Sequence, residues 1–263
     1  MNIRSIMNLP DLLEIRSLVC VEPHPDDNEV GAAGTLFQLA QNGCQIHFVT
    51  VTDGAAGTSN PDVAGTKLAH IRRKERLQAA KLLGVTESIF LNFPDAGTYQ
   101  VDDLTAQLVD IFRKLQPQMV MTVDPWMAYE AHPDHIKTGK AVAEAVLFSS
   151  NPCYKPEAGE PFAVQQIAFY ATNYPNTYVD ITHVWENKLA ALLTHKSQFD
   201  NEEWPLLSEY LRLEANEIYA LKLKHDQQLV TNSTHGSPKN GLAEAFKVLS
   251  SRQLHFFPSA LFS

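Results

Sequence analysis

The apolar and polar positions in the first half of the chain follow two alternating patterns. Short runs rich in apolar and β-branched residues predict strands at residues 17–21, 45–51, 88–91 and 119–123. The segments between them are amphipathic and predict helices at residues 35–41, 67–83 and 104–115. The runs IHFVTV and MVMTV are apolar almost throughout, which is typical of a parallel sheet covered by helices on both faces. The order predicts an α/β fold, Rossmann-like, with three α/β/α layers around a mostly parallel sheet.

The helix expected over residues 67–83 should end at Gly84, because glycine suits the left-handed conformation that closes a helix. Farther on, a helix beginning near His135 is expected. The composition of residues 149–161 predicts a loop within a domain, and residues 231–240 predict a flexible loop. Further elements are expected as strands at 166–170 and 178–181 and two long helices over 184–223.

Composition narrows the class of protein. The chain has 263 residues, of which 44% are hydrophobic, so we expect a single domain over residues 1–263 with one substantial core. The formal net charge is −9 and lysine and arginine are scattered, which argues against a nucleic-acid or anionic-membrane partner. No segment resembles a membrane span or a signal peptide, and Cys20, Cys44 and Cys153 have no disulfide or metal-site spacing. A cytoplasmic protein with reduced cysteines is expected.

The first candidate for chemistry follows the strand expected at residues 17–21. His24, Asp26 and Asp27 come directly after it, and Pro23 and Pro25 restrict the backbone on either side of the histidine. In an open parallel sheet, ligands bind beyond the carboxyl ends of the strands. Three titratable side chains at such an end therefore indicate a site.

A second group, His132, Asp134 and His135, follows the strand expected at residues 119–123. Its loop can reach the same crevice if the two strands are neighbours where the strand order reverses. One histidine and one carboxylate from the first loop with one histidine from the second give the ligand count of a catalytic zinc. A single such residue is more often a helix cap or turn residue, but capping does not require this many carboxylates and imidazoles.

Five blocks of the sequence, in this order, carry a resemblance to a known family: PHPDDNEVGAAGTL, IRRKERLQAAKLLGV, LNFPDAG, HPDH and KLAALLTHKSQ. Together they resemble the LmbE-like or PIG-L deacetylases over most of the chain. The resemblance implies a zinc-dependent enzyme that removes the acetyl group from an N-acetylglucosamine-type amino sugar. It also implies a homo-oligomer, a trimer or a hexamer.

By this resemblance, the Zn²⁺ ligands would be His24, Asp27 and His135. Asp26 would be the general base that deprotonates the attacking water. His132 would stabilise the oxyanion and protonate the leaving amine, and Asp134 would orient it. These roles agree with chemistry in which zinc polarises an amide carbonyl beside a carboxylate base and an imidazole acid.

The resemblance also implies substrate contacts by Arg72, Asp95 and, in the TDG turn, Asp53. Two of these residues have a simpler alternative. Arg72 could be a solvent-exposed helix residue, and Asp95, after Phe93 and Pro94, could be a turn former. Glu75 is expected to support Arg72 or a helix contact rather than to touch the substrate.

The chain departs from the family pattern at several positions. Ala55 and Ala56 stand where many relatives carry an acidic residue that can bind sugar hydroxyls. Glu130 stands where some relatives have a tyrosine, and Tyr129 lies one residue earlier. Ala33 replaces a frequent glycine, which is tolerated if its φ is negative.

Alternative functions remain open. The segment DPWMAYEAHPDH favours the diacetylchitobiose-deacetylase-like branch, but a thiol-sugar or antibiotic-precursor deacetylase has the same chemistry. A non-catalytic sugar-binding protein would not need both a base and an acid. A dinucleotide site is excluded because no GxGxxG follows the first expected strand.

Overall fold

The computed structural model describes residues 7–229 and 240–255, and a seven-stranded sheet forms its centre in the order β3-β2-β1-β4-β5-β7-β6. The strands are β1 Ser17–Glu22, β2 Gln45–Thr52, β3 Glu87–Phe93, β4 Met119–Val123, β5 Gln166–Tyr170, β6 Thr177–Asp180 and β7 Ala243–Ser250. Strands β1 to β5 pair in parallel, and β7 runs antiparallel between β5 and β6. The predicted Rossmann-like, mostly parallel α/β fold is confirmed.

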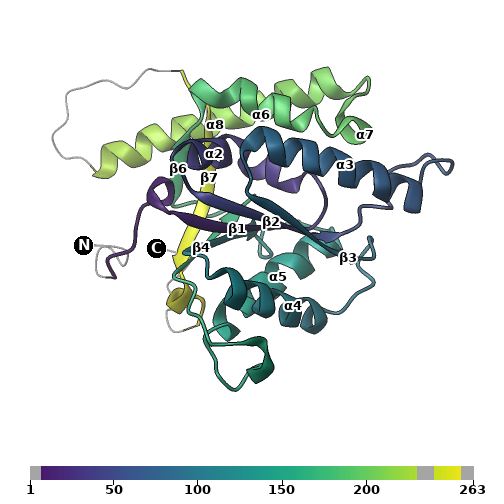
Figure 1. Ribbon diagram of the computed structural model, residues 1–263. Helices are drawn as coiled ribbons and strands as arrows, with labels where there is room; N and C mark the ends of the chain where they lie inside the picture. Colours follow the sequence, from purple (N-terminus) through teal and green to yellow (C-terminus); the bar gives the residue numbers. More distant parts are fainter. Residues whose placement is uncertain (1–6, 230–239, 256–263) are drawn as a thin grey trace.

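Helices cover both faces of this sheet (Figure 1). They are α2 Asp27–Gln41, α3 Thr66–Leu83, α4 Val101–Leu115, α5 Pro133–Phe148, α6 Trp185–Leu192, α7 Lys196–Phe199 and α8 Trp204–Leu229. Short 3₁₀ turns lie at Leu12–Glu14, Pro156–Ala158, Thr182–Val184 and Ser251–Leu254. In Figure 1, α2, α3, α6 and α8 lie above the sheet, and α4 and α5 lie below it. The three layers follow from this arrangement.

Each face of the sheet buries its own apolar layer. Leu18 and Cys20 of β1 belong to the layer under α2, whereas Val19 and Val21 belong to the layer over α4 and α5. Successive side chains of a strand point to opposite faces, so a strand covered on both sides must be apolar at every position. This explains the continuous apolar runs in the sequence.

The predicted end of α3 is confirmed, because Gly84 has a φ of 75° and its N–H caps the helix. Helix α2, however, begins at Asp27 rather than near residue 35. Its first turns carry small residues because the helix packs closely: a Cβ at Gly31 would lie 2.4 Å from the Tyr170 ring, and one at Gly34 would lie 2.7 Å from Ile181. Ala33, in the same helix, has no positive φ, so it fits there.

The prediction of two long helices over residues 184–223 is wrong. The segment forms the short helices α6 and α7 and then one long helix, α8, which continues to Leu229. Pro205 is the second residue of α8, and proline lacks the N–H that a helix interior requires, so a new helix can start there but not pass through. Strand β7 was not predicted. The flexible loop predicted at residues 231–240 lies outside the described residues except for Asn240.

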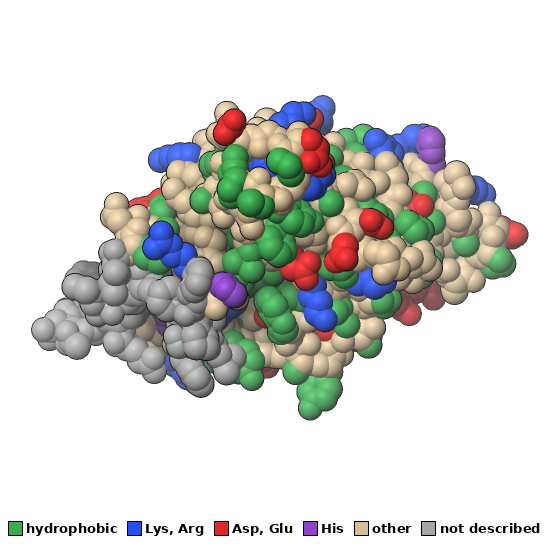
Figure 2. All heavy atoms as spheres, turned by 90° about the horizontal axis from the view of Figure 1, so that it is seen from below, with side chains coloured by type: hydrophobic (Ala, Val, Ile, Leu, Met, Phe, Trp, Pro, Cys, Tyr) green, Lys and Arg blue, Asp and Glu red, His purple; other side chains and the backbone are tan. Residues whose placement is uncertain are grey.

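The surface is mixed in charge on the face that Figure 2 shows. On that face, lysine, arginine and acidic side chains are spread over the described surface and intermixed with hydrophobic side chains (Figure 2). Within residues 7–229 and 240–255, no helix is long and apolar enough to cross a membrane.

Candidate metal centre at the carboxyl edge of the sheet

The two HPD segments of the sequence meet at the centre of the sheet. Strand β1 pairs with β2 on one side and with β4 on the other, so the strand order reverses between β1 and β4. His24 follows β1, and His132 and His135 follow β4 after a loop. As expected from the sequence, both segments therefore lie at the switch point of the sheet, where α/β proteins bind ligands.

His24, Asp27 and His135 form one compact group, which we call the candidate metal centre. His24 Nδ1 lies 3.1 Å from Asp27 Oδ2, and His135 Nε2 lies 3.5 Å from Asp27 Oδ1. One ligand atom from each residue lies within 4.8 Å of the other two. Two imidazoles and one carboxylate are the donor set of many catalytic zinc sites, so these residues fit a divalent metal.

His24 also contacts carboxylates on its other side. Its Nε2 lies 3.2 Å from Asp134 Oδ2 and 3.3 Å from Asp95 Oδ1. Asp134 is fully buried and also accepts a hydrogen bond of 2.9 Å from the Ala96 N–H. The Nδ1 side of the His24 ring thus faces Asp27 of the candidate metal centre, and its Nε2 side contacts two further carboxylates.

The electrostatics of this group reflect its surplus of carboxylates. Burial lowers the pKa of His24, but Asp134, Asp27 and Asp95 outweigh this effect and raise it to about 12. Burial alone would raise the pKa of Asp27, yet His135 and His24 hold it well below its usual value. The carboxylates of the site therefore stabilise positively charged groups placed next to them.

Asp26 precedes α2 in a backbone conformation that is rare for a residue other than glycine, with φ 139° and ψ −19°. Such strain is typical of functional sites. Its Oδ1 accepts a hydrogen bond of 3.1 Å from Arg72 Nη2. Burial raises the pKa of Asp26, and the Arg72 guanidinium offsets only part of this rise. Asp26 is thus a buried carboxylate with enhanced basicity beside the candidate metal centre.

Arg72 lies on the inner side of α3 and is only 3% exposed, so it is not a solvent-exposed helix residue. Besides Asp26, its guanidinium donates to the carbonyl oxygens of Pro25 at 3.0 Å and Gly54 at 3.3 Å. Glu75 instead accepts hydrogen bonds from the Ser197 N–H and hydroxyl, in α7. Arg72 therefore joins the two loops that follow β1 and β2.

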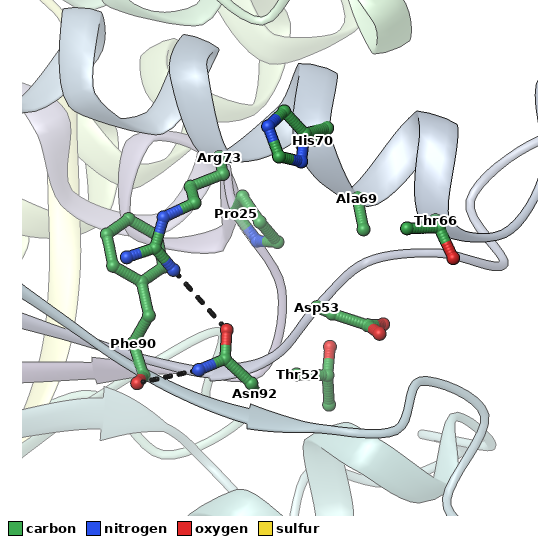
Figure 3. A pocket seen from close by; sticks show the side chains of 9 residues that line it. All are labelled: Pro25, Thr52, Asp53, Thr66, Ala69, His70, Arg73, Phe90 and Asn92. Carbon is green, nitrogen blue, oxygen red and sulfur yellow. Dashed lines mark hydrogen bonds between the residues drawn. The ribbon is translucent and has the colours of Figure 1, made fainter.

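Asp95 and Asp53 lie in different surroundings. Asp95 accepts a hydrogen bond of 2.9 Å from the Ala56 N–H and faces His24, so it belongs to the site. Asp53 accepts from the Ala55 N–H at 3.0 Å and points into a neighbouring cavity of about 350 Å³ (Figure 3). That cavity is lined by Pro25, Thr52, Asp53, Thr66, Ala69, His70, Arg73, Phe90 and Asn92. None of the candidate metal ligands lines it.

His132 is the residue before α5, and its side chain is 44% exposed. Its Nδ1 accepts a hydrogen bond of 3.2 Å from the Asp134 N–H, whereas the nearest Asp134 carboxylate oxygen is 3.9 Å away. Burial and the nearby charges of His24 and His135 lower the pKa of His132. A neutral ring with its proton on Nε2 satisfies this geometry.

Sequence reasoning missed a second group of charged residues beneath the site, which we call the closed cluster: Glu22, Glu29, Arg76 and His195, all fully buried. Arg76 Nη1 lies 3.2 Å from Glu22 Oε2, and Arg76 also forms a bidentate pair with Glu29. His195 Nε2 lies 3.5 Å from Glu29 Oε2. The signal in the sequence was Glu22, a charge at the end of an apolar strand.

Comparisons with known proteins find related chains. The model of the PIG-L family, described as GlcNAc-PI de-N-acetylase, matches residues 19–146. The chain is 38% identical over 203 residues to diacetylchitobiose deacetylase of Thermococcus kodakarensis, covering 76% of each chain. It is 30% identical over 189 residues to 1D-myo-inositol 2-acetamido-2-deoxy-α-D-glucopyranoside deacetylase of Streptomyces avermitilis, covering 61% of each.

A solved structure agrees with these sequence relatives. The N,N′-diacetylchitobiose deacetylase of Pyrococcus horikoshii superimposes with a TM-score of 0.82 and 32% identity, and the match covers 98% of this chain and 97% of that one. Sequence and fold thus lead to one family. The chain belongs to the PIG-L, or LmbE-like, family of deacetylases.

Proposed function

We propose that this protein is a zinc-dependent hydrolase that removes the acetyl group from an N-acetylglucosamine-type amino sugar. The observation that carries the proposal is the convergence of His24, Asp27 and His135 within 4.8 Å. Asp26, with its raised pKa, lies beside them. The relatives that match along most of the chain are named as deacetylases of acetylated amino sugars.

A bound zinc would polarise the amide carbonyl and make a water molecule more acidic. Asp26 is the general base that takes the proton from the attacking water. A carboxylate performs this step best when its pKa lies closer to the working pH than that of a free aspartate, and burial moves Asp26 in this direction. The hydrogen bond from Arg72 fixes the direction of the carboxylate.

His132 has the geometry of the oxyanion partner and acid. Because Nδ1 accepts the Asp134 N–H, the proton of the neutral ring lies on Nε2, where it can be donated to the oxyanion. The ring also lies edge-on to His24, with centroids 4.7 Å apart. Asp134 would act on His132 through this backbone hydrogen bond and through the position of His24.

Substrate recognition is assigned to Arg72, Asp95 and Asp53. Asp95 is the most direct candidate, since its carboxylate lies beside His24. Arg72 would act both on the substrate and through Asp26, and its Nε is buried without a hydrogen-bond partner among the described residues. Asp53 would contact a part of the substrate that extends into the neighbouring cavity.

Acetate release from a panel of substrates tests this function. N-acetylglucosamine, diacetylchitobiose and an inositol-linked N-acetylglucosamine would be compared with N-acetyl amino acids, with and without added zinc. We expect amino sugars to be cleaved faster by a factor on the order of 10² or more, because unpaired buried polar groups penalise substrates without hydroxyls. Equal rates would make the protein a general amidohydrolase.

Zinc content gives the second test. We expect about one zinc per chain, and His24→Ala should lose most of it because the variant lacks one of three ligands. His70→Ala is the matched control, since His70 is exposed and lines only the neighbouring cavity. Normal zinc content in His24→Ala would overturn the ligand assignment.

A thiol-sugar or antibiotic-precursor deacetylase is the second candidate, favoured by the inositol-linked substrate in the name of the Streptomyces relative. The panel distinguishes the two by which amino sugar has the highest kcat/KM. A non-catalytic sugar-binding protein would release no acetate from any of them. A cytoplasmic location and a trimeric or hexameric assembly remain predictions from the sequence.

A further inference from the structure

The loop between β4 and α5 places one carboxylate in contact with two histidines at once. Glu130 Oε1 accepts a hydrogen bond of 2.7 Å from the His132 N–H. Glu130 Oε2 lies 2.9 Å from His135 Nδ1. The other nitrogen of that ring, Nε2, faces Asp27 Oδ1 at 3.5 Å. Glu130 therefore contacts His135 on the side opposite the candidate metal centre.

This contact decides where the proton of His135 resides. A neutral imidazole carries one N–H and one lone pair, and the hydrogen bond at one nitrogen fixes the role of the other. A carboxylate can only accept, so Glu130 requires the proton on Nδ1. The lone pair is then on Nε2 and points toward His24 and Asp27.

His24 has the same kinds of partner, but its two ring nitrogens exchange roles. There a carboxylate, Asp134, lies 3.2 Å from Nε2, and Nδ1 faces Asp27. Each candidate histidine ligand thus has a carboxylate behind it. The two supports differ in place, because Asp134 is fully buried in α5 whereas Glu130 lies in the loop and follows Tyr129, whose φ is 69°.

We propose that Glu130 is a positioning residue for metal binding. It fixes the tautomer and the ring orientation of His135 and so raises the affinity of the site for a divalent metal. This rests on the proposed function, in which His135 is a ligand. It also gives a role to a position at which the chain departs from the family pattern, since a tyrosine there would offer a neutral phenol and not a carboxylate.

The variant Glu130→Gln separates this role from simple loop support. An amide has nearly the shape of the carboxylate, but one of its two ends donates. If its oxygen still accepts from the His132 N–H, its NH₂ group faces His135 Nδ1 and favours the tautomer with the proton on Nε2. We expect the zinc dissociation constant, measured by competition with a chromophoric chelator, to rise by a factor of about 10 to 100.

Glu144→Gln is the matched control. Glu144 lies on α5, is partly buried and accepts a hydrogen bond of 3.1 Å from the Thr105 hydroxyl. The variant therefore removes one carboxylate charge from the helix that follows the Glu130 loop, without touching a histidine. Its zinc affinity should equal that of the wild type. The urea unfolding midpoint of the metal-free proteins gives an independent measure of loop support.

The outcomes are distinct. Weaker zinc binding in Glu130→Gln alone supports the proposal. If Glu130→Gln binds zinc as tightly as the wild type while His24→Ala loses it, the proposal fails and the metal assignment stands, and a lowered midpoint of the metal-free protein would then show a purely structural role. If the wild type binds no divalent metal, both the metal assignment and the role of Glu130 fail.

Discussion

The candidate metal centre and the closed cluster lie close together after β1, yet they balance their charge differently. In the closed cluster, the single guanidinium of Arg76 pairs with both Glu22 and Glu29, and all three side chains are fully buried. Around the candidate metal centre, the carboxylates Asp27, Asp95 and Asp134 face histidines and, among the described residues, pair with no arginine. The carboxylates of the first group thus have an arginine as their common partner. The second group has a surplus of carboxylates, whose charge a divalent cation would balance.

One helix serves both regions. Arg72 and Arg76 are one turn apart on α3, so they project from the same side of the helix. Arg72 donates to Asp26, and Arg76 pairs with Glu22 and Glu29. Through these hydrogen bonds and ion pairs, the two arginines connect α3 to the end of β1, to the loop after it and to the start of α2. A strained Asp26 can persist because its surroundings are held on both sides.

The largest effect should come from the catalytic side of the comparison. Asp26→Asn should keep its metal while kcat falls by a factor of about 10² to 10⁴, because the variant loses only proton transfer. Steady-state kinetics and zinc content on the same preparation measure both. A kcat near that of the wild type would remove Asp26 from the mechanism.

The next effect tests the closed cluster. Arg76→Met should lower the free energy of unfolding by about 3 to 5 kcal/mol, because two buried carboxylates lose their partner. Urea denaturation measures the loss. Arg73→Met is the control: Arg73 is exposed and stacks on Phe90, so its removal should cost about 1 kcal/mol or less. Equal losses in the two variants would show that the closed cluster is not held by charge pairing.

The sequence predicted the chemistry of the first region and not the second for a physical reason. His24, Asp27 and His135 are polar residues that follow the ends of apolar strands, where a fold needs none of them, so they were visible without coordinates. Glu22 and Arg76 lie inside regular elements. Their pairing across 54 residues depends on how α3 packs on the sheet, which periodicity does not reveal.

The fold predictions were right where the apolar pattern of an element was regular and wrong where buried polar residues or glycines interrupted it. The parallel strands were predictable because burial on both faces makes them apolar throughout. Strand β7 was missed because it carries Glu244 and Lys247 at buried positions, and only the structure shows that Glu244 pairs with Lys188 of α6 at 2.7 Å. The early start of α2 was missed because Gly31 and Gly34 interrupt apolar periodicity in order to let the helix approach Tyr170 and Ile181.

A smaller effect should appear in the pH profile of Arg72→Ala. The Arg72 charge lowers the pKa of Asp26, which burial raises, so removing this charge should raise the pKa further. The base must be deprotonated to act, and the acid limb of kcat/KM should therefore move to higher pH. The profile of Arg73→Ala serves as the control. An unmoved acid limb in Arg72→Ala would mean that another group titrates there.

The smallest effect tests whether a change at the end of α3 lowers the free energy of unfolding without changing zinc affinity or kcat. Gly84 ends this helix with a φ of 75°, and Gly43, after α2, has a φ of 80°. Alanine at either position should cost about 1 to 2 kcal/mol in the free energy of unfolding, because a side chain is strained in this conformation. The Cβ added at Gly84 would lie 3.0 Å from Ala40 Cβ, whereas nothing lies within 4 Å of one at Gly43, so Gly84→Ala should lose slightly more.

Neither glycine variant should change zinc affinity or kcat. Gly84 lies about two turns beyond Arg76, and the strain should be absorbed at the end of the helix before it reaches the arginines. Chelator competition and steady-state kinetics on Gly84→Ala, with Gly43→Ala beside it, decide this. If Gly84→Ala alone weakened zinc binding, a displacement at the end of α3 would reach Arg72. The closed cluster and the candidate metal centre would then not be independent of each other.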